Sequence, residues 1–154
     1  MIAALYDWLL FGHIVAAMVW LGGGVLLAAL AVATLRRSDL DGVARFVAGL
    51  RVIGPAVLAP ATVTVLGLGV WLVLDSAAWD FGQTWVQLAV GLIAVAIAVG
   101  AGHQSRAAIS AQRAIDRADH AEARRQLKRW SWGYALVVAL LIATAWDMVF
   151  KPGL

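Results

Sequence analysis

Long apolar stretches without a single charge constrain the fold of this chain more than any other feature. No Asp, Glu, Lys or Arg lies between Trp8 and Leu35, and three comparable stretches follow. About 18 or more such residues are long enough to cross a bilayer as a helix. We therefore predict four membrane-spanning helices, near residues 5–35, 48–75, 84–105 and 130–150.

The overall composition supports a bilayer as the solvent. Hydrophobic residues make up 63% of the 154 residues and charged residues only 14%, whereas soluble domains carry about 25% charged residues. The four spans use nearly the whole chain, which predicts a single transmembrane domain over residues 1–154. The expected fold class is an all-α membrane four-helix bundle with up-down-up-down topology. Because there is no cysteine, disulfides and thiolate metal sites are excluded.

The basic residues predict the orientation of the bundle. Of the 12 Lys and Arg residues, all but Lys151 fall in or beside the connections at residues 36–47 and 106–129. The positive-inside rule places these connections in the cytoplasm and both termini outside. This arrangement accounts for the net charge of +3 by membrane topology, so we expect no nucleic-acid partner.

The connection between the third and fourth spans is expected to be helical. Ser105 to Ala118 is rich in alanine and free of glycine and proline. Asp119 and Glu122 have the spacing of a capping box that starts the fourth helix. The resulting cytoplasmic hairpin presents a basic face that either lies against anionic lipid or docks a cytoplasmic partner. In the second span, Pro55 predicts a kink near its start.

His13 is the strongest candidate for a functional residue, because an ionisable side chain inside a span is costly to bury. It shares a helix face with Trp20. Asp147 is expected at a similar depth, where it would orient the imidazole, as carboxylates do at metal sites. Its spacing from Lys151 also permits an ion pair. The alternatives are a neutral histidine hydrogen-bonded inside the bundle and an ion pair that sets helix depth.

The other two histidines are weaker candidates. His103 is expected at the cytoplasmic interface and His120 in the solvated hairpin turn. His13 and His103 should differ in depth by roughly 20 Å, which excludes them as the two axial ligands of one haem. No three ligand-type residues cluster around either histidine in the sequence, so a classical metal site is not supported.

Two segments resemble known families. His13, Trp20 and the glycines at 22 and 23 resemble the first span of copper resistance protein D and of the membrane-embedded protoporphyrinogen oxidase that binds haem b. That resemblance implies His13 as an axial or metal ligand and Lys151 as a second functional residue. The segment from Trp146 to Gly153, with Ser105-Arg-Ala-Ala, is similar to a family of small four-span bacterial membrane proteins of unknown function. This similarity implies that the protein lies in the bacterial cytoplasmic (inner) membrane.

Two functions remain open from the sequence. In the first, the bundle is redox-linked: His13 binds haem b or, less favoured, copper, with Trp20 packed beside the cofactor and Asp147 tuning the imidazole. In the second, the protein is a non-enzymatic accessory or scaffold, whose small residues around Ala16 and Gly23 pack against a membrane partner or a second copy. A transporter fits less well, because four spans leave little room for a pathway. The sequence identifies no substrate or reaction.

Overall fold

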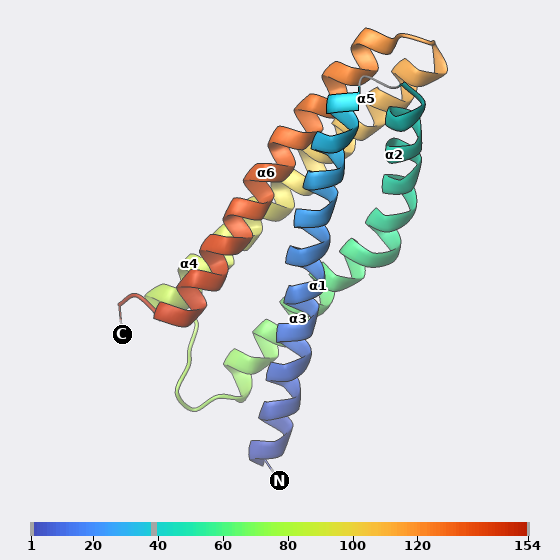
Figure 1. Cartoon of the computed structure of the whole chain (residues 1–154). Coiled ribbons are helices and arrows are strands. Elements are labelled where there is room, and N and C mark those ends of the chain that lie inside the picture. Colours follow the sequence, from blue (N-terminus) through green and yellow to red (C-terminus); the bar gives the residue numbers. More distant parts are fainter. Residues whose placement is uncertain (1, 38–39, 154) are drawn as a thin grey trace.

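Four apolar helices account for nearly the whole chain. In a computed structural model, which describes residues 2–37 and 40–153, they cover Ala4–Arg37, Asp41–Asp75, Thr84–Asp116 and His120–Phe150 (Figure 1). The described residues form helices, turns and bends but no strand. The predicted all-α bundle with four helices of membrane-crossing length is therefore confirmed.

Two wide π-helical turns divide the second and third of these helices. The elements in chain order are α1 (Ile2–Arg37), α2 (Leu40–Ile53), η1 (Gly54–Leu58), α3 (Ala59–Asp75), α4 (Thr84–Ala98), η2 (Val99–Gln104), α5 (Ser105–Asp116) and α6 (His120–Phe150). Proline has no N–H to donate, so Pro55 interrupts the α-helical ladder at the position where a kink was predicted. No proline is present in η2, and the sequence did not signal this second turn.

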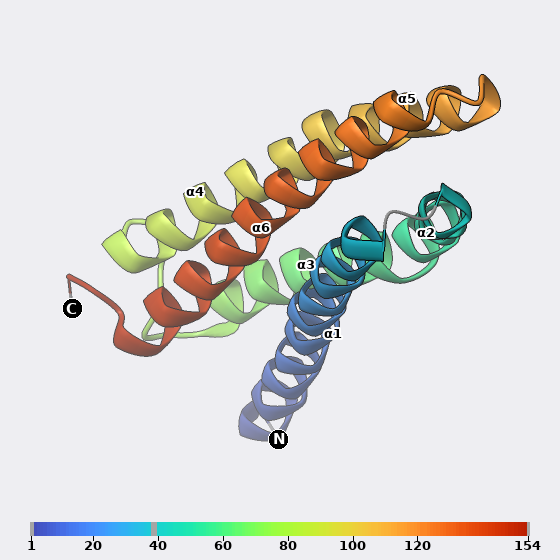
Figure 2. The ribbon, with the colours of Figure 1, turned by 45° about the horizontal axis from the view of Figure 1, so that its top comes forward.

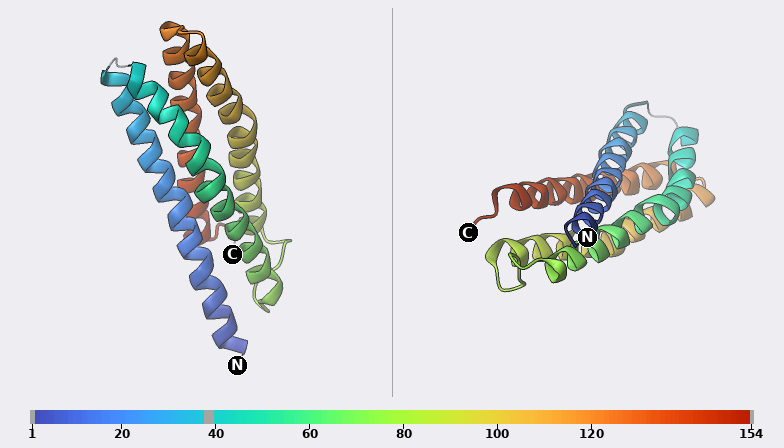
Figure 3. Two further views of the ribbon diagram at one scale, coloured as in Figure 1. Left: turned by 90° about the vertical axis from the view of Figure 1, so that its right-hand side faces the viewer. Right: turned by 90° about the horizontal axis from the view of Figure 1, so that it is seen from below.

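The chain runs up and down between two ends of the bundle. The start of α1 and the end of α6 lie toward one end, here called the terminal end; the end of α1, the start of α2 and the α5–α6 turn lie at the other, the hairpin end (Figures 1 and 3). The N-cap of α6 is Asp119, whose carboxylate accepts a hydrogen bond from the Glu122 amide at 3.0 Å. The helical extension and its capping residue were both predicted. Segment 36–47, expected as a connection, is helical from Leu40 onward.

The hairpin end has a tightly packed core built largely from alanine. Ala107, Ala111 and Ala114 of α5 face Ala123 and Leu127 of α6, and all are at most 5% exposed. Small side chains let two helices approach closely, which explains why this amphipathic hairpin is ordered. The Arg124 guanidinium donates to the Leu35 carbonyl at 2.8 Å. A cation at the C-terminus of α1 also complements the helix dipole.

The bundle is open on one side. Helix α1 packs against α3 and α6, and α4 packs against α6; Figure 2 shows α4 and α6 side by side. Over the described residues, however, no Cα atom of α3 comes within 8 Å of one in α4. The second and third apolar helices therefore leave an opening between them. Apolar side chains dominate the outer surface, as lipid contact requires.

The small residues singled out as an external packing face lie inside the chain's own core. Ala16 is 8% exposed in a cluster with Ala61 and Val65 of α3. A Cβ added to Gly23 would lie 3.3 Å from the Leu58 side chain. Substitutions at Ala16 or Gly23 would therefore disturb the fold of the monomer, so they cannot test assembly with a partner.

Candidate functional site

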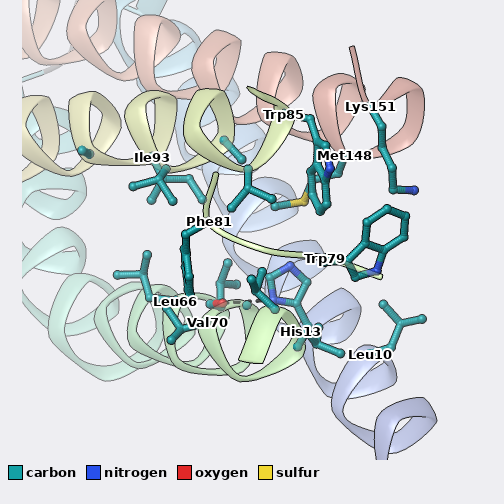
Figure 4. Close-up of a pocket in the computed structure, with 18 of the residues that line it drawn as sticks. Leu10, His13, Leu66, Val70, Trp79, Phe81, Trp85, Ile93, Met148 and Lys151 are labelled. Atoms are coloured by element: carbon teal, nitrogen blue, oxygen red, sulfur yellow. Dashed lines mark hydrogen bonds between the residues drawn. The ribbon is translucent and has the colours of Figure 1, made fainter. Parts of the chain in front are cut away.

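His13 is buried in the half of the bundle nearer the termini and is fixed by a backbone group. Its side chain is 7% exposed, and Nδ1 lies 3.0 Å from the Val65 carbonyl oxygen of α3 (Figure 4). A carbonyl can only accept a hydrogen bond, so Nδ1 carries the proton in the neutral ring. The lone pair is then on Nε2, the nitrogen on the opposite side of the ring.

A glycine lets the ring come this close to α3. A Cβ on Gly69 would lie 3.1 Å from Cε1 of His13 and 3.5 Å from Nδ1. The first of these distances is shorter than an ordinary van der Waals contact, so even alanine would force the imidazole to move. Gly69 follows Val65 by one helical turn, and the pair forms a seat for the ring: one residue supplies the acceptor and the other supplies the space.

The ring of His13 borders a large, mostly apolar cavity of about 420 Å³. This space, here called the histidine cavity, lies between α1, α3, α4 and the end of α6, in the opening of the bundle. Its labelled walls in Figure 4 are Leu10, Leu66, Val70, Trp79, Phe81, Trp85, Ile93, Met148 and Lys151. Such a cavity, with one unpaired nitrogen in an apolar wall, has the general character of a cofactor or ligand site.

The connection between α3 and α4 places two of these aromatic walls. Side-chain amides hold its backbone: Gln83 donates to the Ala78 carbonyl at 3.0 Å, and Gln87 to the Phe81 carbonyl at 3.2 Å. Trp79 then meets Trp85 edge to face, with ring centroids 5.3 Å apart. The connection thus places aromatic side chains over the cavity and also joins α3 to α4.

Lys151 lies at the same cavity as His13. It adopts a left-handed conformation (φ 43°) just after α6, and its amide donates to the Asp147 carbonyl at 2.8 Å. Its ammonium lies 5.0 Å from the Trp79 ring centroid and 5.8 Å from that of Trp85, within the range of cation–π attraction. Residues from opposite ends of the chain therefore converge on one space.

Asp147 does not meet His13 or the Lys151 ammonium. It is 0% exposed, and neither carboxylate oxygen has a hydrogen-bond partner among the described residues. The expected Asp147–His13 bond is therefore corrected: the Val65 carbonyl orients the imidazole. The expected ion pair with Lys151 is likewise absent in the described part of the chain. Asp147 lies on the buried face of α6, one turn after buried Thr144.

Trp20 lies beside His13 but outside the histidine cavity. It is 6% exposed and lines a smaller space of about 340 Å³, between α1 and α6, that His13 also borders. Met148 lines both spaces. Of the four residues expected at a cofactor, His13 and Lys151 share the larger cavity, Trp20 borders the smaller one but not the larger, and Asp147 borders neither.

The remaining histidines have other surroundings. Nε2 of His103 lies 3.2 Å from the Arg129 carbonyl, and its ring packs over Gly133, where a Cβ would come within 2.5 Å of it. His103 therefore joins η2 to α6. His120 is exposed at the start of α6. Over the described residues, no group of three His, Cys, Asp or Glu side chains could hold a metal ion.

Sequence reasoning did not place Val65, Gly69, Phe81 and Met148 at the candidate site, nor the two tryptophans Trp79 and Trp85. The signal for Gly69 was the glycine itself, because a glycine inside a membrane span permits a close approach of another group. Val65 acts through its backbone, which no residue type reveals. The aromatic side chains depend on how the α3–α4 connection folds back.

Comparison with known proteins gives a family but no activity. No curated protein matches the chain, and no solved structure matches it. One family model, described as a predicted integral membrane protein (DUF2269), matches residues 7–152, a range that includes both His13 and Lys151. Together with the four apolar helices, this match shows that the chain belongs to the DUF2269 family of predicted integral membrane proteins.

Proposed function

We propose that this protein is a redox-linked membrane bundle in which His13 holds haem b through Nε2. One observation carries the proposal: the bond from Nδ1 to the Val65 carbonyl leaves Nε2 as the free electron-pair donor at a large apolar cavity. Histidines that bind metals characteristically donate their other N–H in this way, which fixes the tautomer and strengthens the ligand.

The other walls of the histidine cavity suit the same group. Trp79, Phe81 and Trp85 offer flat apolar surfaces to a macrocycle, and Gly69 leaves the ring of His13 free to lie close to α3. Lys151 supplies a positive charge for a carboxylate at the edge of the macrocycle. Trp20 and Asp147 are second-rank candidates in this proposal, since they lie beside the cavity or away from it.

Each residue then has a defined task. A haem supplies one-electron chemistry when bound. Within the chain, His13 binds the iron, the Val65 carbonyl orients the imidazole, Lys151 binds the anionic edge, and the aromatic connection excludes water. Copper is the less favoured cofactor. In its favour, the soft thioether of Met148 lines the same cavity as His13.

The proposed location is a bacterial inner membrane with both termini outside. The arginines gather at the hairpin end: Arg36 and Arg37 end α1, and Arg113 lies in the last turn of α5. The positive-inside rule assigns that end to the cytoplasm. The histidine cavity then opens in the outer half of the membrane.

An absorption spectrum tests the proposal. Protein purified from haem-replete cells should show a Soret band that shifts on reduction. His13→Ala should lose the band, and added imidazole should partly restore it, because the ligand is replaced without restoring the side chain. His120→Ala is the matched control and should keep the band. A colourless wild-type protein, or a band that survives in His13→Ala, contradicts the proposal. Copper in place of haem by elemental analysis would favour the second cofactor.

The alternative is an accessory or scaffold protein, supported by open glycines on the lipid-facing surface. A Cβ on Gly22 or Gly67 would meet nothing within 4 Å, and both residues are exposed. Such positions allow another helix to approach closely. Under this alternative, detergent-solubilised protein elutes as a dimer or with a partner, and Gly22→Leu dissociates it. A monomer with an intact haem spectrum speaks against it.

A further inference from the structure

A second cavity lies closer to the hairpin end, where the two π-helical turns face each other across the opening of the bundle. It has a volume of about 480 Å³ and is lined by η1 and η2, with Gly54 on one side and Gly100 on the other. Here it is called the π-turn cavity. Wide turns of this type are rare and occur often at functional sites, and two of them border this one space.

One side chain of this cavity is buried without a partner. Gln104, the last residue of η2, is 6% exposed, and neither its amide nitrogen nor its amide oxygen has a hydrogen-bond partner among the described residues. A buried amide without partners destabilises the fold, because the hydrogen bonds it makes with water are lost and not replaced. A ligand in the cavity would relieve this penalty if it accepted a hydrogen bond from Nε2 in one chemical state and donated one to Oε1 in another.

The rest of the lining describes the ligand. Trp20, Trp130 and Tyr134 supply aromatic wall, and the last two are stacked with centroids 4.6 Å apart. None of the lining residues carries a charge, so an anionic phospholipid headgroup would find no counter-ion. Because no Cα atom of α3 lies within 8 Å of one in α4 among the described residues, the space between these helices gives a molecule dissolved in the membrane a route in from the side.

We propose that the π-turn cavity binds the head group of a lipid-soluble quinone. A quinone ring is flat and uncharged, and its carbonyl oxygen accepts a hydrogen bond from the Gln104 amide nitrogen. The hydroxyl of the reduced form donates to the amide oxygen, so one side chain suits both redox states. Its isoprenoid tail lies in the opening toward the histidine cavity, since Ile97 lines both cavities. This binding proposal stands independently of the haem.

The test is equilibrium binding of decylubiquinone to the full-length protein in nanodiscs, followed by quenching of tryptophan fluorescence. Wild-type protein should bind saturably. Gln104→Leu keeps the volume and removes both hydrogen-bonding atoms, so affinity should fall about tenfold. Gly100→Leu should abolish binding, because a Cβ there meets nothing within 4 Å and the larger side chain then fills the cavity.

One control keeps the test specific. Gly91→Leu adds the same bulk at another open glycine, outside the π-turn cavity, and should bind as the wild type does. Non-saturable quenching by the wild type overturns the proposal, and so does unchanged affinity in Gln104→Leu. A phospholipid that co-purifies and is not displaced by decylubiquinone, detected by mass spectrometry, also overturns it. If Gly100→Leu fails to fold, Gln104→Leu alone decides.

Discussion

At the scale of single residues, the candidate site depends on backbone groups and on missing side chains as much as on His13 itself. The Val65 carbonyl holds Nδ1 at 3.0 Å, and Gly69 leaves room for the ring. The sequence singled out His13, because an ionisable group inside a span stands out, and suggested Lys151 only through the resemblance to the copper and haem proteins. It could not identify the seat of the ring, because a carbonyl is common to every residue.

Gly69→Val should therefore weaken cofactor binding without touching a ligand atom. The new side chain enters the space of the imidazole, which must rotate away from Val65 and lose its orientation. Loss of such a supporting contact typically lowers metal affinity by about 10–100-fold. The measurement is the haem titration monitored at the Soret band. Gly67→Val, two residues earlier on α3 and open to lipid, should titrate like the wild type; equal affinities in all three would contradict the expectation.

Lys151→Gln tests the positive charge at the cavity mouth. The amide keeps most of the side-chain length but cannot pair with a carboxylate, so haem should dissociate faster. A surface-accessible ion pair contributes about 1 kcal/mol or less, which corresponds to an affinity loss of up to about fivefold. Apomyoglobin capture of haem measures the dissociation rate. Lys128→Gln, exposed on α6 at the hairpin end, should release haem at the wild-type rate.

At the scale of elements, the long apolar helices, the α6 cap and the break at Pro55 followed from composition and local rules, whereas the break at η2 did not. Asp119 was recognised from its spacing to Glu122, and the helix does begin there. In contrast, η2 contains no proline and forms where His103 and Gln104 pack against α6 at Gly133. That contact brings together residues about thirty positions apart, which no local pattern encodes.

Gly133→Ala should destabilise the contact between η2 and α6. The added Cβ would lie 2.5 Å from His103 and 3.0 Å from the Gln104 amide nitrogen, so both side chains must shift. Overpacking of this kind costs about 1–3 kcal/mol, measured as a lower midpoint of thermal unfolding in detergent. Gly91→Ala, with open space around its Cβ, should be neutral or slightly stabilising. An unchanged midpoint in Gly133→Ala would show that the close contact does not exist.

Asp119→Ala should loosen the start of α6. The carboxylate satisfies the Glu122 amide, and loss of an N-cap costs about 1 kcal/mol. Hydrogen exchange at Glu122 should accelerate, while Asp119→Asn should retain most of the protection because its side-chain oxygen still accepts.

At the scale of the whole molecule, the bilayer as solvent and the up-down order of the helices were predictable, but the order of helices around the bundle was not. Hydropathy predicts that a segment inserts into the membrane, but it does not predict which helix that segment packs against. Helix α1 meets α3 and α6, and no Cα atom of α3 lies within 8 Å of one in α4 among the described residues. The close contact of α1 with α3 depends on small residues such as Ala16, which is buried in a cluster with Ala61, and Gly12, where a Cβ would lie 3.1 Å from the Leu68 side chain. Their matching partners lie on distant segments.

The proposed orientation can be tested because the chain has no cysteine of its own. Ala77→Cys, exposed in the α3–α4 connection, and Ala121→Cys, exposed at the start of α6, place one thiol at each end. In intact cells a membrane-impermeant maleimide should label the first and spare the second until the membrane is permeabilised. The reverse pattern would invert the topology.

The opening between α3 and α4 lies between helices of membrane-crossing length. A small molecule that enters through it comes from the hydrocarbon phase, so the concentration that matters is the mole fraction in lipid and not the amount added to the buffer. Compounds of equal intrinsic affinity will then rank by their partition coefficients. Apparent dissociation constants will rise in proportion to the amount of lipid or detergent in the sample.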